Sequence, residues 1–98
     1  MTCLHLVNRA ASSSDALQRC LSLSLPGDVV LLIEDGVYGA LPEVFAILDR
    51  DPAVTVQALL ADVEARGLQR RLANQIDVID YAGFVELTEQ NNPVVSWS

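Results

Sequence analysis

The stretch "GDVVLLIEDGVYGAL", residues 27–41, decides the fold of this chain. It follows Pro26 with a turn signal and continues, over residues 29–33, with five aliphatic side chains and no polar alternation. An apolar run of this kind is typical of a strand that is covered on both faces, as in a parallel sheet. The acidic pair and glycine at 34–36 end the run and predict a turn. The segment therefore predicts a buried strand, a short turn and then a helical region.

The same alternation of elements continues on both sides of this segment. Strands are predicted over residues 3–7, 54–60 and 76–80, with a further extended piece at 92–97. Helices are predicted after the serines at 12–14, with Leu17, Leu21 and Leu25 on one stripe, from Pro42 to Asp49, from an Asp62 cap to Gly67, and over 81–90. Strands and helices that alternate in this way indicate βαβ units. We therefore predict a single small α/β domain over residues 1–98, with three layers, a mainly parallel sheet of about five strands, and helices on both faces.

Composition limits the possible partners. Hydrophobic residues make up 51% of the chain and charged residues 19%, which is more apolar than a small monomer needs for its own core. Part of the surface is therefore expected to face another protein subunit. The net charge is −7 and all six basic residues are arginine, with Arg70 and Arg71 as the one adjacent pair. Direct binding of nucleic acid is not expected, because neutralising a phosphate backbone needs clustered cations.

The sequence also predicts where the protein resides. The aliphatic run at 29–33 is far shorter than the roughly 18 apolar residues of a membrane helix. The first residues, "MTCLHLVNR", lack the basic start and long apolar stretch of a secretory signal. We therefore predict a cytoplasmic protein without a membrane partner, in which Cys3 and Cys20 are free thiols.

Cofactor and metal sites find little support in the sequence. The loop at 8–14, between the first strand and helix, has no glycine to cradle a dinucleotide phosphate. Two cysteines and one histidine do not supply the four ligands of a structural zinc site. No cofactor and no metal are therefore expected. His5 is interpreted as a hydrogen-bonded core residue, with a role as base for a Ser or Cys nucleophile left as the alternative.

The two thiols and one acidic pair are the other candidates for chemistry. Cys3 starts a strand and is expected to pack. Cys20 flanks Leu17 and Leu21 and is placed near the border between core and surface, without a helix N-terminus or a cation close enough to activate it. Spacing alone favours a packing role for Cys20. The pair at 34 and 35 suits either acid/base chemistry or an Asp-Gly turn capped by Asp35, and the turn is the favoured interpretation.

Four blocks in a fixed order show a family resemblance that extends from end to end. They are "LLIEDGV" at 31–37, "DVEARGL" at 62–68, "IDYAGFVELT" at 79–88 and Trp97. With the start "MTCLHLVNRA" and a length of 98 residues, the chain resembles the DsrH/TusB family.

The resemblance implies a subunit of a cytoplasmic sulfur relay. DsrE, DsrF and DsrH, or TusD, TusC and TusB, are small α/β proteins that form a heterohexamer with two copies of each. Sulfur moves through it as a cysteine persulfide and passes to a small carrier, DsrC or TusE. The Dsr branch oxidises stored sulfur, and the Tus branch supplies the 2-thiouridine of the tRNA wobble position.

The resemblance also bears on Cys20, because DsrH-type chains carry a cysteine in the first helix and TusB-type chains generally do not. The chain is accordingly interpreted as a DsrH-like sulfurtransferase subunit of intracellular sulfur oxidation, with Cys20 as candidate persulfide carrier. The main sulfur-accepting cysteine is expected on the DsrE/TusD-like partner. Two alternatives stay open: a TusB-type subunit for tRNA thiolation, and a non-catalytic scaffold in which Cys20 is incidental.

Overall fold

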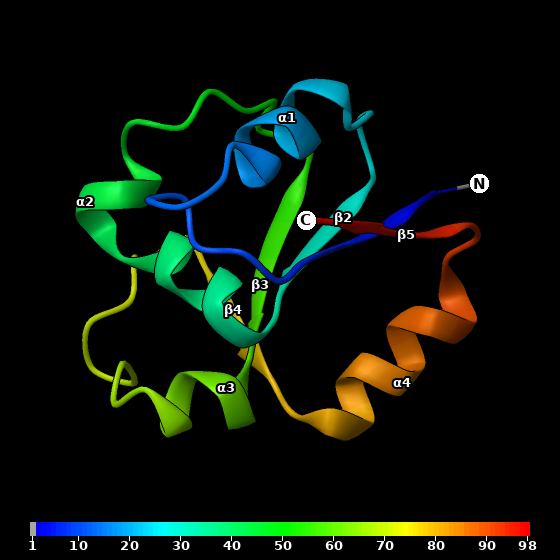
Figure 1. Cartoon of the computed structure of the whole chain (residues 1–98). Coiled ribbons are helices and arrows are strands. Elements are labelled where there is room, and N and C mark those ends of the chain that lie inside the picture. The colour runs from blue at the N-terminus through cyan, green and yellow to red at the C-terminus, as the bar shows by residue number, and fades with distance from the viewer. Residues whose placement is uncertain (1) are drawn as a thin grey trace.

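A five-stranded parallel sheet forms the centre of the computed structural model, which describes residues 2–98 (Figure 1). The strand order is β4-β3-β2-β1-β5, and every neighbouring pair is parallel. The strands are β1 (Leu4–Val7), β2 (Val29–Leu32), β3 (Thr55–Leu59), β4 (Asp77–Ile79) and β5 (Val94–Trp97). The predicted strands are all present, and the extended piece at 92–97 joins the sheet beside β1 as an edge strand.

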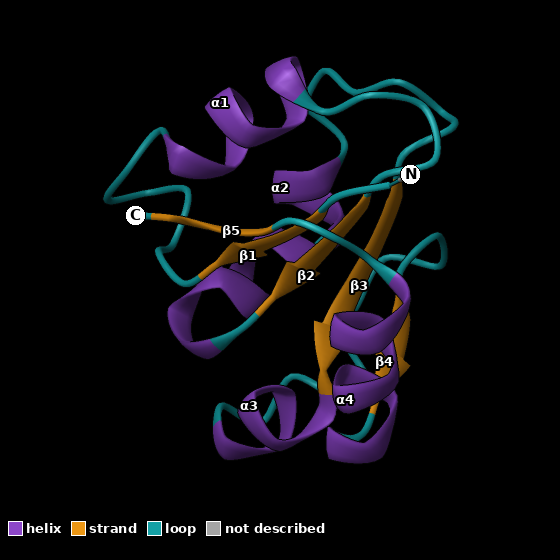
Figure 2. Cartoon of the chain, turned by 90° about the vertical axis from the view of Figure 1, so that its right-hand side faces the viewer, coloured by secondary structure: helices purple, strands orange, loops and turns teal. Residues whose placement is uncertain are grey.

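Helices cover the sheet on both sides (Figure 2). They are α1 (Ala16–Leu23), the 3-10 helix η1 (Glu34–Ala40), α2 (Pro42–Phe45), α3 (Leu60–Ala65) and α4 (Tyr81–Gln90). The helices α1, α2 and η1 lie on one side of the sheet, and α4 lies on the other (Figure 1). The predicted three-layer α/β fold is therefore confirmed. Within residues 2–98, no helix combines the length and the apolar character that crossing a membrane requires.

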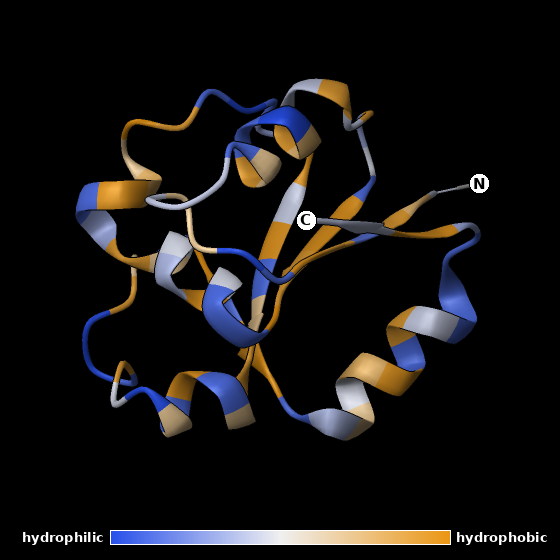
Figure 3. Cartoon of the chain, in the orientation of Figure 1, coloured by the Kyte–Doolittle hydropathy of each residue, from blue (hydrophilic) through white to orange (hydrophobic). Residues whose placement is uncertain are grey.

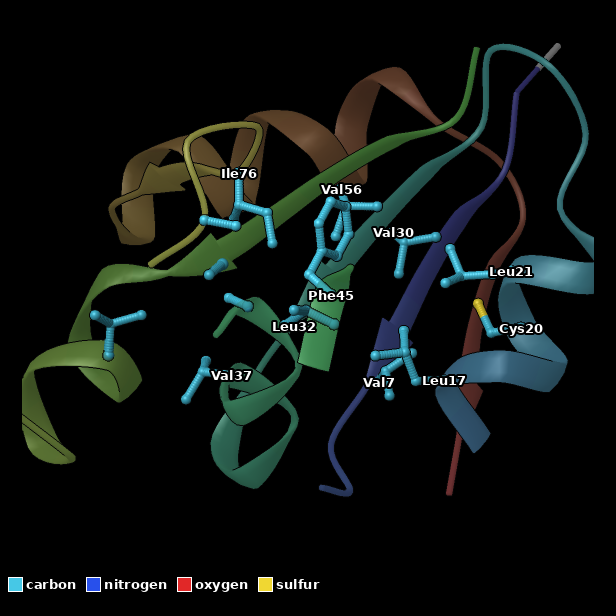
Figure 4. Close-up of a cluster of buried hydrophobic side chains, with 14 of the residues drawn as sticks. Val7, Leu17, Cys20, Leu21, Val30, Leu32, Val37, Phe45, Val56 and Ile76 are labelled. Carbon is cyan, nitrogen blue, oxygen red and sulfur yellow. The ribbon is translucent and has the colours of Figure 1, made fainter. Parts of the chain in front are cut away.

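The main core lies between the sheet and the helices on the α1 side (Figure 4). Alternate strand residues point to the same face, so that Val30 and Leu32 of β2 face α1 while Leu31 faces α4. All three are fully buried. From α1 the core receives Leu17 and, one turn further along the inner face, Cys20 and Leu21. The covering of β2 on both faces explains its unbroken aliphatic sequence.

The α4 side of the sheet is covered far less completely. No residue of α4 is buried, although apolar positions recur along the helix (Figure 3). On the strands beneath it, Leu6 and Val29 are only half-buried, and the side of β5 that faces this layer leaves Val94 44% exposed. This layer therefore leaves apolar surface in contact with solvent.

Four helix boundaries differ from the predictions. The first helix begins after Asp15 rather than after a serine cap, although Ser14 Oγ does accept the N–H of Ala16 at 3.1 Å. It ends at Leu23, so Leu25 lies beyond the helix. The second helix stops at Phe45 instead of Asp49, and the chain continues in turns.

The third helix, α3, begins at Leu60, two residues before the predicted cap Asp62. Asp62 thus lies within the first turn of α3, and its carboxylate accepts the N–H of Glu34 instead of capping the helix. The predicted stop is confirmed, since the helix ends at Ala65 and Gly67 follows with φ of +65°.

Candidate functional site

Two of the sequence blocks meet at the carboxyl edge of the sheet. The backbone N–H of Glu34 donates to Asp62 Oδ2 at 2.8 Å. Arg66 donates through Nε and Nη2 to Asp35 Oδ1, at 3.1 and 3.0 Å, and through Nη1 to the carbonyl oxygen of Asp62 at 3.2 Å. We call these four residues the carboxyl-edge clasp. It joins the 3-10 helix that follows β2 to α3, which follows β3.

The backbone of the first block explains its composition. Glu34 has φ of +49°, a left-handed conformation that is unfavourable for a residue with a side chain, and its N–H bond to Asp62 helps to hold it there. At Gly36 a Cβ atom would lie 2.1 Å from the carbonyl oxygen of Val7, so only glycine fits. Both features bring η1 close to the end of β1.

The acidic pair at 34 and 35 therefore has a structural role in the fold. The favoured interpretation of a turn is correct, but the turn is a 3-10 helix, and the Asp35 side chain pairs with Arg66 instead of capping. Beside the clasp lies an open hollow of about 440 Å³. The hollow is lined by Ala10, Ala11, Ser12, Asp35, Tyr38, Leu41 and Val44, so hydroxyls and one carboxylate are its polar side-chain groups.

A second group of polar side chains gathers at the amino edge of the sheet. It consists of Cys3, His5 and Asp28, together with Trp97, whose indole reaches His5 from the carboxyl end of β5, and we call these four residues the amino-edge cluster. His5 Nε2 lies 3.0 Å from Asp28 Oδ2, and Trp97 Nε1 lies 3.0 Å from His5 Nδ1. Cys3 Sγ lies 3.9 Å from the same Nδ1. Strand alternation places Cys3 and His5 on the α1 side, and Trp97 on β5 is aligned with Val7 on that side.

The hydrogen bonds of the amino-edge cluster define the protonation state of His5. An indole N–H can only donate, so Nδ1 of His5 accepts the hydrogen bond from Trp97. The ring proton is therefore on Nε2, where it donates to Asp28. His5 is thus a neutral imidazole held at both nitrogens. It is also 6% exposed, which confirms its interpretation as a hydrogen-bonded core residue.

Asp28 anchors this cluster as a buried carboxylate. It accepts the backbone N–H of Cys3 at Oδ1 and that of Leu25 at Oδ2, both at 3.0 Å, in addition to the bond from His5. Burial alone would raise the pKa of Asp28, but the hydrogen bonds from His5, Cys3 and Leu25 outweigh it and lower that pKa. The carboxylate therefore stays ionised at neutral pH.

The Cys3 thiol is half-buried and stays protonated in this setting. Burial, and then the negative charge of Asp28, raise its pKa. Donor atoms of Cys3, His5 and Asp28 lie within 4.8 Å of one another, a spacing that a metal ion can bridge. However, His5 has one nitrogen protonated and the other accepting from Trp97. The imidazole therefore has no free lone pair for a metal in this arrangement.

Cys20 lies elsewhere, in the core. Its side chain is 0% exposed and points toward the sheet between Leu17 and Leu21 (Figure 4). The predicted position at the border of core and surface is therefore wrong, because this turn of α1 faces the strands. Burial raises the pKa of Cys20 to about 11, and the hydrogen bond with Ser24 only partly offsets it. A carrier role for Cys20 stays a prediction.

Sequence reasoning missed the amino-edge cluster. The i, i+2 spacing of Cys3 and His5 on a strand was a signal that both side chains share a face. Asp28 looked like a turn residue, and only the pairing of β1 with β2 brings it to His5. Trp97 reaches His5 because β5 crosses back to pair with β1.

Comparison with known proteins places the chain in a family. A family model described as "DsrH like protein" matches residues 9–94. The Protein TusB of Serratia proteamaculans is 37% identical over 95 residues, which cover 96% of this chain and 99% of that protein. The Protein TusB of Salmonella dublin has the same identity and coverage.

Two solved structures share the fold. Protein Tm0979 from Thermotoga maritima superimposes with a TM-score of 0.70 at 26% identity, over 90% of this chain and 92% of that chain. The ychN protein from E. coli gives a TM-score of 0.73 over 98% of this chain and 99% of that chain, and at 16% identity it supports the fold alone. With a family model that covers most of its length and relatives at 37% identity, this chain belongs to the DsrH/TusB family of sulfur-relay subunits.

Proposed function

We propose that this chain is the TusB-type subunit of a cytoplasmic sulfur-relay complex that serves 2-thiolation of the tRNA wobble uridine. Its partners are a DsrE/TusD-like and a DsrF/TusC-like subunit, in a heterohexamer with two copies of each, and a DsrC/TusE-like carrier receives the sulfur. The observation that carries this proposal is the 37% identity to TusB proteins over almost the whole length. It favours the tRNA branch over the sulfur-oxidation branch that the sequence alone suggested.

The uneven covering of the sheet supports a subunit that works in an assembly. Helix α4 buries none of its residues, and Tyr81 and Val85 on it are 71% and 39% exposed. Contiguous apolar surface is costly in water and typical of protein interfaces. We infer that a partner subunit covers the α4 layer.

The setting of Cys20 supports the scaffold form of this function. A persulfide carrier must present a thiolate to an incoming sulfur atom. Cys20 is buried in the core, so its sulfur is not accessible in the folded chain. Its pKa is raised to about 11, so it is also not a thiolate at neutral pH. We therefore propose that Cys20 packs the α1 face and that the main acceptor cysteine belongs to the DsrE/TusD-like partner.

Sulfur oxidation is the second candidate function, favoured by the presence of a cysteine in α1, as in DsrH-type chains. The two branches differ in the final acceptor. Deletion of the gene should abolish wobble 2-thiouridine if the tRNA branch is correct. Normal 2-thiouridine together with impaired oxidation of stored sulfur would assign the chain to the other branch.

Co-purification tests the assembly. The tagged chain, co-expressed with DsrE/TusD-like and DsrF/TusC-like subunits, should carry both through size exclusion at the mass of a heterohexamer. Val85→Glu on α4 should break the assembly, whereas Ile47→Glu, at a position 78% exposed on the opposite side of the sheet, should not. An intact complex with V85E would show that the partner does not cover the α4 layer.

Substitution of Cys20 tests the scaffold assignment. C20S removes the thiol while Ser24 still provides a hydrogen-bond partner one turn away. We expect assembly and sulfur transfer to continue in the reconstituted complex. Loss of transfer from an intact C20S complex would instead make Cys20 a carrier.

A further inference from the structure

The amino-edge cluster orders its groups as an activated nucleophile requires. Its thiol and carboxylate both lie beside the imidazole, at different nitrogens: Cys3 Sγ is 3.9 Å from Nδ1 of His5, and Nε2 is 3.0 Å from Asp28 Oδ2. In catalytic arrays of this kind the carboxylate orients the ring and stabilises the imidazolium that forms when the ring takes a proton. Asp28 is 5% exposed and held by three hydrogen bonds, so it provides a fixed orientation.

Trp97 decides whether this array is active. The lone pair of His5 Nδ1, which would accept the thiol proton, already accepts the indole N–H at 3.0 Å. The contact of the thiol with Nδ1, at 3.9 Å, is longer and weaker, and the thiol also lies 3.8 Å from the carbonyl oxygen of Leu4, to which it can donate. Cys3 has a raised pKa, so without a base it stays a protonated and slow thiol. In this arrangement the Cys3 thiol therefore has no base available to it.

We propose that Cys3 is a latent nucleophile toward the outer sulfur of a persulfide, with His5 as its base, and that Trp97 keeps it at rest until the indole leaves Nδ1. The choice of a persulfide as co-reactant rests on the proposed sulfur-relay function. The reactivity of Cys3 itself rests on the geometry of the cluster.

The step balances without an added oxidant or reductant. His5 Nδ1 takes the proton of the Cys3 thiol, and the thiolate attacks the outer sulfur of a donor R–S–SH. The new bond is Cys3 Sγ–S, and the S–S bond of the donor breaks, so that R–S⁻ leaves and takes the proton from His5. The products are Cys3–S–SH and R–SH, and the electron count of the two reactants is unchanged.

The position of Trp97 makes its release feasible. It lies on the edge strand β5, which pairs on one side with β1. Its ring is half-buried, with the Arg19 guanidinium 6.0 Å from the ring centre. An open and mainly apolar hollow of about 390 Å³ lies between this ring and α1, lined in part by Arg19 and Leu23. The indole therefore has space into which to turn, on a surface that an apolar partner residue can enter.

Alkylation of the full-length chain by iodoacetamide tests the proposal, with Cys3 and Cys20 followed separately by peptide mass mapping. Trp97→Phe should accelerate alkylation of Cys3 about tenfold, since removing one hydrogen bond of ordinary strength shifts an equilibrium by about that factor. His5→Gln keeps a donor for Asp28 but removes the base, so the double variant H5Q/W97F should return to the wild-type rate. Cys20 serves as an internal control, because its labelling reports unfolding of α1.

Each result decides the proposal. No acceleration in W97F overturns the masking role of Trp97, and acceleration that persists in H5Q/W97F shows that Trp97 only limited access. If H5Q/W97F becomes labelled at Cys20, H5N/W97F replaces it in the same comparison. Glutathione persulfide is the second probe, and it should add one sulfur atom to Cys3 of W97F and none to Cys20. Alkylation without sulfur transfer overturns the choice of co-reactant.

The outcome is separable from the proposed function. Cys3→Ser should leave co-purification with the partner subunits intact, because the side chain is not part of the α4 layer. A failed assembly would thus count against the relay subunit, and an unreactive Cys3 would count against this inference alone.

Discussion

The two edges of the sheet differ in what the sequence reveals about them. At the carboxyl edge, the blocks at 31–37 and 62–68 are easily recognised, and they meet in a clasp whose Asp35 is 63% exposed. At the amino edge, no recognisable motif is formed by Cys3, His5, Asp28 and Trp97. Their side chains nevertheless contact one another, with the carboxylate and the imidazole buried and the thiol half-buried. In open parallel sheets, ligands usually bind at the carboxyl edge. In this chain the recognisable edge holds the fold together, and the array of reactive groups lies at the opposite edge.

Burial explains why the two edges have different energetics. The ion pairs of the clasp stand in water on one side, where solvent screens them. The amino-edge cluster is shielded, so each unsatisfied donor or acceptor there carries the full cost of its desolvation. Substitutions at the two edges should therefore differ in size and in their dependence on pH.

The largest effect is expected from Gly36→Ala at the carboxyl edge. The added Cβ would lie 2.1 Å from the carbonyl oxygen of Val7, and neither backbone can yield without moving η1 off β1. We expect a loss of about 3 kcal/mol or more in the free energy of unfolding, near the upper end for single substitutions. Chemical denaturation followed by circular dichroism measures it.

Gly39→Ala is the matched control for this prediction. Its Cβ would meet a methyl group of Leu17 at 2.6 Å, which can shift by a change of rotamer. It should therefore cost clearly less than G36A. Equal losses would mean that the close approach of η1 to Val7 is not a special constraint of the carboxyl edge.

The next effect is expected from Asp28→Asn at the amino edge. The amide can accept fewer of the three hydrogen bonds and leaves at least one buried donor without a partner. The expected loss is about 2 kcal/mol at neutral pH. Asp15→Asn is the control. The side chain of Asp15 is 76% exposed, so this substitution should lower the free energy of unfolding only slightly.

The pH dependence of D28N follows from the lowered pKa of Asp28. Its folded value lies below the ordinary 3.8, so its contribution to stability is fully present above that pH and is lost as the pH falls through the folded value. The difference in unfolding free energy between wild type and D28N should therefore be constant at neutral pH and shrink below about pH 4. A difference that does not change with pH would mean that the carboxylate charge is not what stabilises this edge.

Periodicity was enough to predict the sheet, its parallel strands and the layers of helices. The unbroken aliphatic run at 29–33 predicted a strand covered on both faces, and β2 is indeed buried on both faces of the sheet. The predicted position of Cys20 was wrong because the spacing of Leu17 and Leu21 does not show how much of the helix surface is buried. In the structure the buried face of α1 also includes Cys20. The amino-edge cluster depends on the strand order, which local sequence patterns do not encode. Asp28, just before β2, and Trp97, at the end of β5, reach His5 from opposite sides of β1.

The smallest effect is expected from Arg66→Ala, which opens the clasp. Arg66 is 22% exposed, and it makes two hydrogen bonds to a carboxylate that is 63% exposed. Screening limits the loss to about 1 kcal/mol, most of it from the hydrogen bonds and the packing of the arginine stem. Arg66→Lys keeps the charge but not the fork of N–H donors, so it should recover only part of that loss. A double-mutant cycle with Asp35→Ala isolates the pair, with an expected coupling of about 0.5 kcal/mol that falls as salt is added. A coupling energy larger than the stability loss caused by D28N, or one that salt does not reduce, would mean that the carboxyl edge is shielded from water as the amino edge is. The contrast between the two edges would then not hold.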